Sequence, residues 1–474
     1  MRPAPPSAAP GALPTARDVV SALPWKWHTQ GAIFVIGGLG FMFDAWDVAL
    51  NGFLIPLLSR EWGLSVGQAA WIATANLIGM AVGAFVWGGI ADRIGRKRAF
   101  TLTLLVFSVF TVAGALAPNI WLFCAFRFLA GFGLGGCIPV DYALVGEFTP
   151  ARHRGRVLTA MDGWWPVGAT LCALTSAWLL SIGSWHLLML VMVLPALLTV
   201  AVRALIPESP MYLLSAGRTA EADAVISRLV ARTGAQAREW THEGVEPMPH
   251  AAGLRERLRA GTGQVVELWR HSPIITATSW LLFVAVLLVY YAALTWLPKI
   301  LRAAGLADQA AFLVTGAMTA IGILGVVAAA LLVEAVGRKW VLGGSAVAAS
   351  VCLVWFSLEL GAGSAGDVPA PGTASLSMGA KAAILAFGFF IQVAIPALYT
   401  YVSELYHTRL RGSGFGWASA ASRVATGLAP LVFGSLLWPL LGLPMTFALL
   451  GGLVVVAVAA MALCTRETRG EELA

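Results

Sequence analysis

Three charged residues interrupt long apolar stretches of the sequence: Asp44, Asp47 and Arg127. A charge in the middle of a bilayer costs about 2.5–3.5 kcal/mol, so each of them needs a chemical reason. Asp44 and Asp47 are three positions apart, which places both carboxylates on one face of a helix. At a rise of about 1.5 Å per residue they lie about 20 and 24 Å inside their stretch, and Arg127 reaches a depth similar to that of Asp47. The three residues could exchange a proton or could form a static structural pair.

If these stretches exchange a proton, a carboxylate has to bind it, because no histidine lies in the middle of an apolar stretch. Burial favours the neutral form of a carboxyl group, whereas a nearby arginine favours the charged form. A carboxylate that gains and loses an arginine partner when parts of the protein move therefore binds and releases a proton. We predict this proton-coupling role for Asp44, Asp47 and Arg127, and which aspartate serves stays open.

A second group of residues near the middle of other stretches combines aromatic faces, an amide and a cation. A planar ring that stacks on tryptophan or tyrosine gains about 0.5–1.5 kcal/mol beyond burial. Arg423 could hold a carboxylate through two parallel hydrogen bonds. Asp141 fits either a vestibule lining or a salt bridge to a loop arginine, and each aromatic ring fits packing as well as binding. We predict that the substrate-binding residues are Asp162 and Trp165, on one helix face, with Tyr290, Tyr291, Gln392, Tyr399 and Arg423.

The composition shows which class of protein carries these residues. Of 474 residues, 58% are hydrophobic and 12% are charged, and the mean hydropathy is +0.79. Soluble proteins have about 45–50% apolar and about 25% charged residues, so a soluble enzyme, a disordered scaffold and a coiled-coil fibre are excluded. The hydrocarbon offers the backbone no hydrogen-bond partner, and no barrel alternation is visible. We therefore predict an all-α integral membrane protein.

A span needs about 20 apolar residues, and the sequence predicts twelve such helices. They cover residues 31–58, 68–91, 99–117, 119–147, 156–180, 185–206, 274–301, 310–334, 340–360, 378–404, 413–438 and 443–464. One long connection divides them into two bundles of six. The predicted domains are a disordered or amphipathic tail (1–28), an N-terminal bundle (29–206), a cytoplasmic linker with amphipathic helices (207–273), a C-terminal bundle (274–464) and a C-terminal tail (465–474).

Basic residues concentrate in the connections on one side of the predicted spans, for example at Arg93, Arg154, Arg338 and Arg466. The positive-inside rule places that side and both termini in the cytoplasm. This distribution accounts for the net charge of +7 and the pI of about 9.4 without a nucleic-acid partner. The five cysteines show no CxxC or secreted spacing and fit buried apolar positions.

An internal repeat relates the two halves. Gly88-Gly-Ile-Ala-Asp92-Arg-Ile-Gly95-Arg96-Lys97 matches Ala330-Leu-Leu-Val-Glu334-Ala-Val-Gly337-Arg338-Lys339 at an offset of 242 residues. Glu147 with Arg154 matches Glu404 with Arg411 at an offset of 257, and Pro207-Glu208-Ser209-Pro210 has a weaker echo at Arg466-Glu467-Thr468-Arg469-Gly470. Two related halves imply a pseudo-two-fold axis and a midplane site. We predict a gating network at the cytoplasmic end that comprises Asp92, Arg96, Glu147, Arg154, Glu334, Arg338, Glu404 and Arg411.

The loop from Gly88 to Lys97 resembles the signature of the major facilitator superfamily, which implies two pseudo-symmetric six-helix bundles and alternating access. Pro207-Glu-Ser-Pro and Ser403-Glu404-Leu-Tyr resemble its sugar-porter branch, in which an acid on span 1 and an arginine on span 4 couple protons. The sequence departs from that branch in three places. Span 7 lacks the paired glutamines of sugar carriers, Met211 replaces an arginine, and His407 replaces a proline.

Three other segments resemble the bacterial niacin transporters, relatives of the synaptic vesicle glycoproteins and the aromatic-acid/proton symporters: Phe43-Asp44-Ala-Trp46-Asp47-Val, Gly135-Gly136-Cys-Ile-Pro139-Val and Gly163-Trp164-Trp165-Pro-Val-Gly168. This resemblance implies proton-coupled import of a small aromatic carboxylate, with nicotinate or nicotinamide first. It implies no enzymatic reaction, metal or cofactor. The expected partners are the substrate, protons and the lipid bilayer, and we expect a monomer in the bacterial inner membrane.

Several alternatives stay open at this point. A sugar or other metabolite facilitator, a drug exporter and a transporter-shaped sensor without flux all fit a twelve-helix membrane protein. A transport ATPase is set aside, because the chain has no Gly-Lys-Ser/Thr phosphate loop. A channel is disfavoured by the two-fold repeat and its paired charged motifs.

Overall fold

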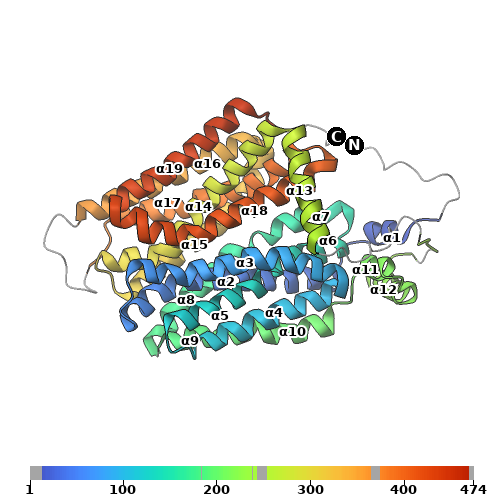
Figure 1. Ribbon diagram of the computed structural model, residues 1–474. Helices are drawn as coiled ribbons and strands as arrows, with labels where there is room; N and C mark the ends of the chain where they lie inside the picture. The colour runs from blue at the N-terminus through green and yellow to red at the C-terminus, as the bar shows by residue number, and fades with distance from the viewer. Residues whose placement is uncertain (1–12, 183, 237–238, 243–253, 364–373, 469–474) are drawn as a thin grey trace.

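The computed structural model describes residues 13–182, 184–236, 239–242, 254–363 and 374–468, and it shows a helical membrane protein (Figure 1). The first half, blue to green in Figure 1, and the second half, yellow to red, lie side by side as two bundles. The long helices of the first bundle are α2 (Ala32–Glu61), α3 (Val66–Ile94), α4 (Arg96–Gly114), α5 (Ile120–Gly135) with α6 (Cys137–Phe148), α8 (Trp164–Ile182), and α9 (Trp185–Leu190) with α10 (Leu194–Leu205). Those of the second are α14 (Pro273–Ala303), α15 (Asp308–Ala335), α16 (Arg338–Gly363), α17 (Met378–Leu405), α18 (Thr408–Val432) and α19 (Trp438–Cys464).

The membrane-spanning helices confirm the predicted fold class. Eleven stretches of the described chain are long and apolar enough to cross a membrane, and the last runs for 53 residues from Gly412 to Cys464. A helix of that length would measure about 80 Å, more than twice a hydrocarbon core of about 30 Å. Gly442, inside α19, breaks it with a φ of 71°, so this stretch supplies two spans, one formed by α18 and the start of α19 and one by the rest of α19. The two bundles therefore have six spans each.

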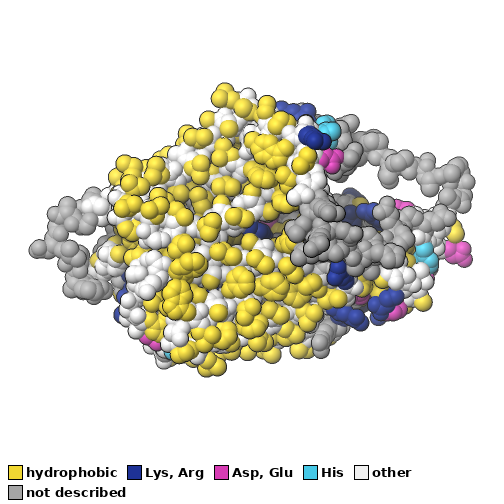
Figure 2. Space-filling model, in the orientation of Figure 1, with side chains coloured by type: hydrophobic (Ala, Val, Ile, Leu, Met, Phe, Trp, Pro, Cys, Tyr) yellow, Lys and Arg dark blue, Asp and Glu magenta, His cyan; other side chains and the backbone are white. Residues whose placement is uncertain are grey.

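The ends of the molecule differ in charge. Figure 2 shows hydrophobic side chains over the flanks of both bundles, and Lys and Arg gathered at the end where Figure 1 places α1 (Ala16–Ala22), α11 (Pro210–Ser215) and α12 (Thr219–Thr233). We call this the arginine-rich end. α13 (Leu254–His271) also belongs to the connection between the bundles. The opposite end carries the connection between α14 and α15.

The region predicted as a disordered or amphipathic tail, 1–28, is partly ordered. Thr15 begins α1 with a capping box to Asp18, and Thr15 forms an isolated β-bridge with Thr241 of the connection between the bundles. Ala16 and Val20 are buried at 0% and 3% exposure. Proline-rich composition misled the prediction, because these contacts come from a distant segment. Residues 1–12 lie outside the described residues.

Glycines bring α3 and α5 unusually close together. An ideal Cβ on Gly131 would lie 2.1 Å from the backbone oxygen of Asn76, and one on Gly79 would lie 2.1 Å from that of Phe128. Any side chain at these positions would force the two backbones apart. The close approach places Asn76 of α3 beside Arg127 of α5, where Asn76 Nδ2 donates to the Arg127 carbonyl at 3.2 Å.

Gly131→Ala should lower the melting temperature, because overpacking at a backbone contact costs about 1–3 kcal/mol. Gly344→Ala is the matched control, since a Cβ there meets no heavy atom within 4 Å. Replacing a helical glycine in open space should leave stability unchanged or raise it by about 0.4–1 kcal/mol. Thermal unfolding in detergent measures both variants. Equal melting temperatures for the two would contradict this account of α3–α5 packing.

Candidate transport site and its gates

A fully buried ion pair joins Asp47 of α2 to Arg127 of α5. Arg127 Nη1 and Nη2 donate to the two carboxylate oxygens of Asp47 at 2.7 and 2.8 Å, and both side chains are 0% exposed. Asn76 Nδ2 donates to Asp47 Oδ2 at 3.0 Å, and Asn51 Oδ1 accepts from Arg127 Nη2 at 2.9 Å. All four side chains belong to the first bundle. A rigid motion between the bundles therefore leaves this pair intact.

Asp44, one turn before Asp47, has a different environment. Its side chain is 0% exposed, and neither carboxyl oxygen has a hydrogen-bond partner within the described chain. It interacts electrostatically with Asp47 on its own helix and with Arg423 of α18 in the second bundle. Arg423 is only partly buried. A carboxyl of one bundle thus interacts electrostatically with a cation of the other.

Aromatic residues from both bundles meet in the same layer. Trp165 Nε1 of α8 donates to Tyr290 Oη of α14 at 2.8 Å, and Gln392 Nε2 of α17 donates to the same hydroxyl at 3.3 Å. The rings of Trp165 and Tyr291 meet edge to face with centroids 6.0 Å apart. Trp165 and Tyr290 are 9% and 2% exposed. Four residues from three predicted spans therefore do come together, and they bridge the bundle interface.

Tyr399 and Arg423 belong to the edge of this layer in the second bundle. Tyr399 stacks on Phe283 with ring centroids 5.5 Å apart and contacts Phe415 edge to face. Arg423 interacts electrostatically with Tyr399 and with Tyr291. Tyr399 therefore interacts with Arg423, while its ring packs against Phe283 and Phe415.

Asp162 lies in a turn and not within a continuous helix. The predicted span 156–180 is divided into α7 (Ala151–Met161) and α8, and Asp162 lies in the turn between them. The expectation of one continuous helix through Asp162 and Trp165 was wrong, because the helix breaks at Asp162 and Gly163. Asp162 instead accepts a hydrogen bond from Tyr142 Oη at 2.5 Å.

At the end opposite the arginine-rich end, polar contacts tie the bundles together. Lys299 Nζ of α14 donates to Ser59 Oγ of α2 at 3.2 Å, and Arg302 Nη1 donates to the Pro56 carbonyl at 3.2 Å. Asp308 of α15 forms ion pairs with Arg302 and, at 3.5 Å, with Arg60. The bundles are thus in direct contact at this end.

At the arginine-rich end, the first bundle contains part of the predicted gating network. Arg96 Nε lies 3.4 Å from Glu147 Oε1, which joins the start of α4 to the end of α6. Arg154 does not bond to Glu147 among the described contacts; its guanidinium donates to the carbonyls of Gly146 and Thr149 at 3.1 and 3.3 Å. Arg154 therefore caps the end of α6, because α7 follows it within a few residues.

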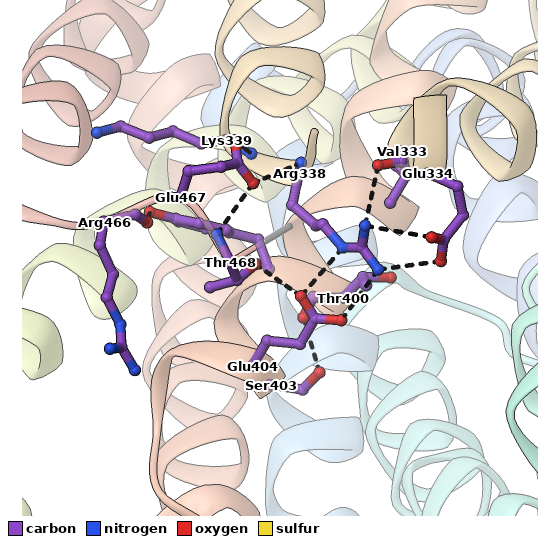
Figure 3. A network of polar contacts seen from close by, with 11 residues as sticks. Val333, Glu334, Arg338, Lys339, Thr400, Ser403, Glu404, Arg466, Glu467 and Thr468 are labelled. Carbon is purple, nitrogen blue, oxygen red and sulfur yellow. Dashed lines mark hydrogen bonds and ion pairs between the residues drawn. The ribbon is translucent and has the colours of Figure 1, made fainter. Parts of the chain in front are cut away.

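The second bundle contains the matching network (Figure 3). Arg338 Nε donates to Glu404 Oε2 at 3.1 Å, and Arg338 Nη2 donates to Glu334 Oε1 at 3.0 Å. Thr468 Oγ1 donates to Glu404 Oε2 at 2.6 Å. The side chains of Asp92 and Arg411 lie outside the described part of the structure, so their gating role stays a prediction.

Glu208 and Glu467, which belong to the weakest of the three internal repeats, occupy equivalent positions in the two bundles. Glu208 Oε1 accepts from the backbone N–H of Lys97 at 3.0 Å, at the start of α4. Glu467 accepts from the backbone N–H groups of Arg338 and Lys339 at 2.9 and 3.1 Å, at the start of α16 (Figure 3). Each of these helices follows a glycine with positive φ, Gly95 at 100° and Gly337 at 120°. We call these contacts the glutamate clasps.

Sequence reasoning missed several residues of these sites. Asn51 and Asn76 complete the Asp47–Arg127 network, and their polarity inside apolar spans was the signal that could have found them. Asp308 was not recognised, because it begins a helix in a short connection. The clasps were detectable from the repeat itself, since both glutamates occupy corresponding places.

Comparison with known proteins agrees with this architecture. The sequence matches the family described as Sugar (and other) transporter over residues 32–474. It is similar to the niacin transporter NiaP of Acinetobacter baylyi, with 32% identity over 92% of this chain and 94% of that protein. It is also similar to the gallate transporter of Pseudomonas putida, with 31% identity over 89% of each protein, and to the 4-hydroxybenzoate transporter PcaK of Acinetobacter baylyi, with 27% identity over 92% and 90%. These relatives are transporters, not enzymes.

Among solved structures, the xylose transporter XylE from E. coli in a partially occluded inward open conformation has the same fold. The TM-score is 0.72, and the match covers 94% of this chain and 99% of XylE at 17% identity. The family match spans both bundles, and the similarity to NiaP covers nearly the whole chain. The protein is therefore a secondary transporter of the major facilitator superfamily and belongs to its sugar (and other) transporter family.

Proposed function

We propose that the protein imports a small aromatic carboxylate together with a proton, and that nicotinate is the first candidate substrate. One observation carries this proposal: Asp44 of the first bundle is buried, has no hydrogen-bond partner among the described residues, and interacts electrostatically with Arg423 of the second bundle. The names of the relatives support the substrate class, since gallate, 4-hydroxybenzoate and nicotinate each combine an aromatic ring with a carboxylate.

Recognition would divide between a ring site and a charge site. Trp165, Tyr290 and Tyr291 offer aromatic surfaces at the bundle interface, where Gln392 adds an amide. Arg423 offers a guanidinium that matches a carboxylate in two parallel hydrogen bonds. The Trp165–Tyr290 hydrogen bond has to open for a ring to enter, so binding is coupled to movement of the bundles. Tyr399 and Asp162 would border the site rather than form its centre.

Proton coupling would use Asp44 rather than Asp47. The Asp47–Arg127 pair lies within one bundle and is fully hydrogen-bonded, so rocking of the bundles does not separate it. Asp44 and Arg423 lie on opposite bundles and approach or separate as the bundles move. When a substrate carboxylate occupies Arg423, Asp44 loses its counter-ion, and the neutral form of a buried carboxyl is then favoured. A proton therefore enters with each anion.

Orientation and gating follow from the charges. We assign the arginine-rich end to the cytoplasm, with both termini there, in a bacterial inner membrane. The two bundles and the connection between them would act as separate units in a monomer. The contacts of Asp308, Arg302 and Lys299 would then close the outer side in this conformation. The networks of Arg96 and Arg338 each lie within one bundle, so they would hold the helix ends beside the gate in place while the bundles move.

The test of the proposed function uses purified protein in liposomes with acid outside and the membrane potential clamped at zero. One proton per substrate and a gradient of one pH unit support about tenfold accumulation. Wild type should reach about this ratio with radiolabelled nicotinate and should leave xylose near onefold. A carrier that accumulates xylose and ignores every aromatic acid would overturn the substrate class.

Asp44→Asn should lower accumulation in this assay to about onefold while exchange of nicotinate continues, because an amide cannot carry the proton. Glu359→Gln is a matched control that removes an acid near the opposite end, where Glu359 accepts from Ser377. It should accumulate as wild type does. Full accumulation by Asp44→Asn would exclude Asp44 from coupling.

Arg338→Ala should slow uptake by about tenfold without weakening substrate binding, since it removes charge-assisted hydrogen bonds from the gate and not from the midplane. Calorimetry gives the affinity and liposome uptake gives the rate. Arg218→Ala removes an exposed ion pair with Glu221 on the linker and should change neither. Loss of binding in step with uptake would place Arg338 outside the gate.

A further inference from the structure

We propose that Asp44 and Asp141 form a two-carboxyl proton site, which holds one proton in the empty carrier and takes up a second when an anion occupies Arg423. This inference rests on the proposed function and adds Asp141 of α6 to it. In this arrangement Asp141 is a positioning residue, because it acts on the substrate only through the protonation of Asp44.

Asp141 was expected to line a vestibule or to pair with a loop arginine, and the structure shows a different environment. Its side chain is 0% exposed, and neither carboxyl oxygen has a hydrogen-bond partner within the described chain. An arginine partner is therefore not seen among the described residues. A buried carboxyl with no donor is stable only if it is neutral or shares a proton.

Gly40 lets Asp141 approach the helix that carries Asp44. An ideal Cβ at Gly40 would lie 3.0 Å from Asp141 Oδ2, so the carboxyl lies directly against the backbone of α2. Gly40 is one helical turn before Asp44 on that helix. Asp141 and Asp44 interact electrostatically. Asp44 belongs to the middle layer, and Asp141 lies one turn nearer the arginine-rich end.

The groups around the pair come from four helices. On α2 it is Asp47, which is neutralised by Arg127. On α6 they are Cys137 and Tyr142, and on α14 it is Tyr291. On α18 it is Arg423. Among these described neighbours, Arg127 is already paired with Asp47 of its own bundle, whereas no ion pair is seen for Arg423. The single positive charge of Arg423 can balance one carboxylate of the pair, not both.

The charge balance of the cycle follows. Two buried carboxyls that interact and have no other donor do not both ionise, so the empty carrier keeps one proton on the pair and one negative charge that Arg423 balances. An anionic substrate that binds Arg423 takes over that counter-charge. The remaining carboxylate then binds a second proton at its oxygen. One anion and one proton enter together, and both leave when the bundles separate Arg423 from the site.

The decisive measurement needs no ligand: an infrared pH titration of the protonated carboxyl band in purified full-length protein. Interacting carboxyls titrate in two steps separated by more than about one pH unit. Wild type should show both steps, and Asp141→Asn and Asp44→Asn should each lose one of them. Asp141→Glu should restore two steps. Cys137→Ala changes the same packing without a charge and should titrate as wild type does.

Adding nicotinate separates this inference from the proposed function. In wild type the band should grow by about one carboxyl for each nicotinate bound, measured with calorimetry on the same sample. If the two-step titration is present but nicotinate leaves the band unchanged, the protein has the carboxyl pair but does not take up a proton with the anion. That result would contradict the proposed function and not the pair. An Asp141→Asn titration identical to that of wild type, in a variant with an unchanged melting temperature, would overturn the pair.

Discussion

Arg127→Leu should destabilise the protein more than any other single replacement considered for it, with a loss of about 3–5 kcal/mol in the free energy of unfolding. The reason is that the replacement leaves Asp47 buried and charged, with no cation to balance it. Asn51 would also lose a donor. Thermal and denaturant unfolding in detergent both measure the effect, and the two should agree in sign.

The double replacement Asp47→Leu with Arg127→Leu is the control for this prediction. Removing both charges avoids an unpaired buried ion, and buried pairs replaced by apolar groups are often neutral in stability. The double variant should therefore be more stable than Arg127→Leu alone, which gives a coupling energy from the double-mutant cycle. An Arg127→Leu protein as stable as wild type would show that water reaches Asp47.

Arg423→Gln should weaken binding of nicotinate by about ten- to a hundredfold and binding of nicotinamide far less. A charge-assisted hydrogen bond contributes about 1.5–3 kcal/mol, and only the acid makes one. Because Arg423 is only partly buried and sits opposite Asp44, its removal should not collapse the fold. Calorimetry with the acid and the amide on the same preparation gives the ratio directly.

Trp165→Ala is the matched comparison for the Arg423 experiment. It removes a ring that both ligands would use, so it should weaken the acid and the amide by similar factors. If Arg423→Gln weakened the acid and the amide equally, Arg423 would brace α18 and would not select a charge. An unchanged affinity in Trp165→Ala would move the ring site away from α8.

The sequence predicted those features that a single helix determines. Depth along a span predicted that Arg127 lies at the level of Asp47, and the structure shows them bonded at 2.7 Å. Hydropathy and length predicted the twelve spans. The repeat placed Glu334, Arg338 and Glu404 in one predicted network, and the structure shows Arg338 bonded to both glutamates. These predictions need only helix geometry and the cost of a charge in hydrocarbon.

Features that depend on contacts between helices were not predictable in the same way. The break at Asp162 depends on how α7 meets the bundle, so a continuous span was expected there. Within the described chain, the lack of a hydrogen-bond partner at Asp44 and Asp141 depends on which side chains other helices bring to them. Arg154 was expected to pair with Glu147, but the end of α6 presented carbonyls that were nearer.

The glutamate clasps have a consequence for how the protein is made. Glu208 belongs to the segment that directly follows α10, so the first clasp can close as soon as that segment has been synthesised, before any residue of α14 exists. Domains generally fold as units, in the order in which they leave the ribosome. The first bundle can therefore be complete in the bilayer while the second is still being inserted, and it offers a finished surface for the later helices. Glu467 follows α19 in the chain, so the second clasp can form only after all six spans of the second bundle have been synthesised.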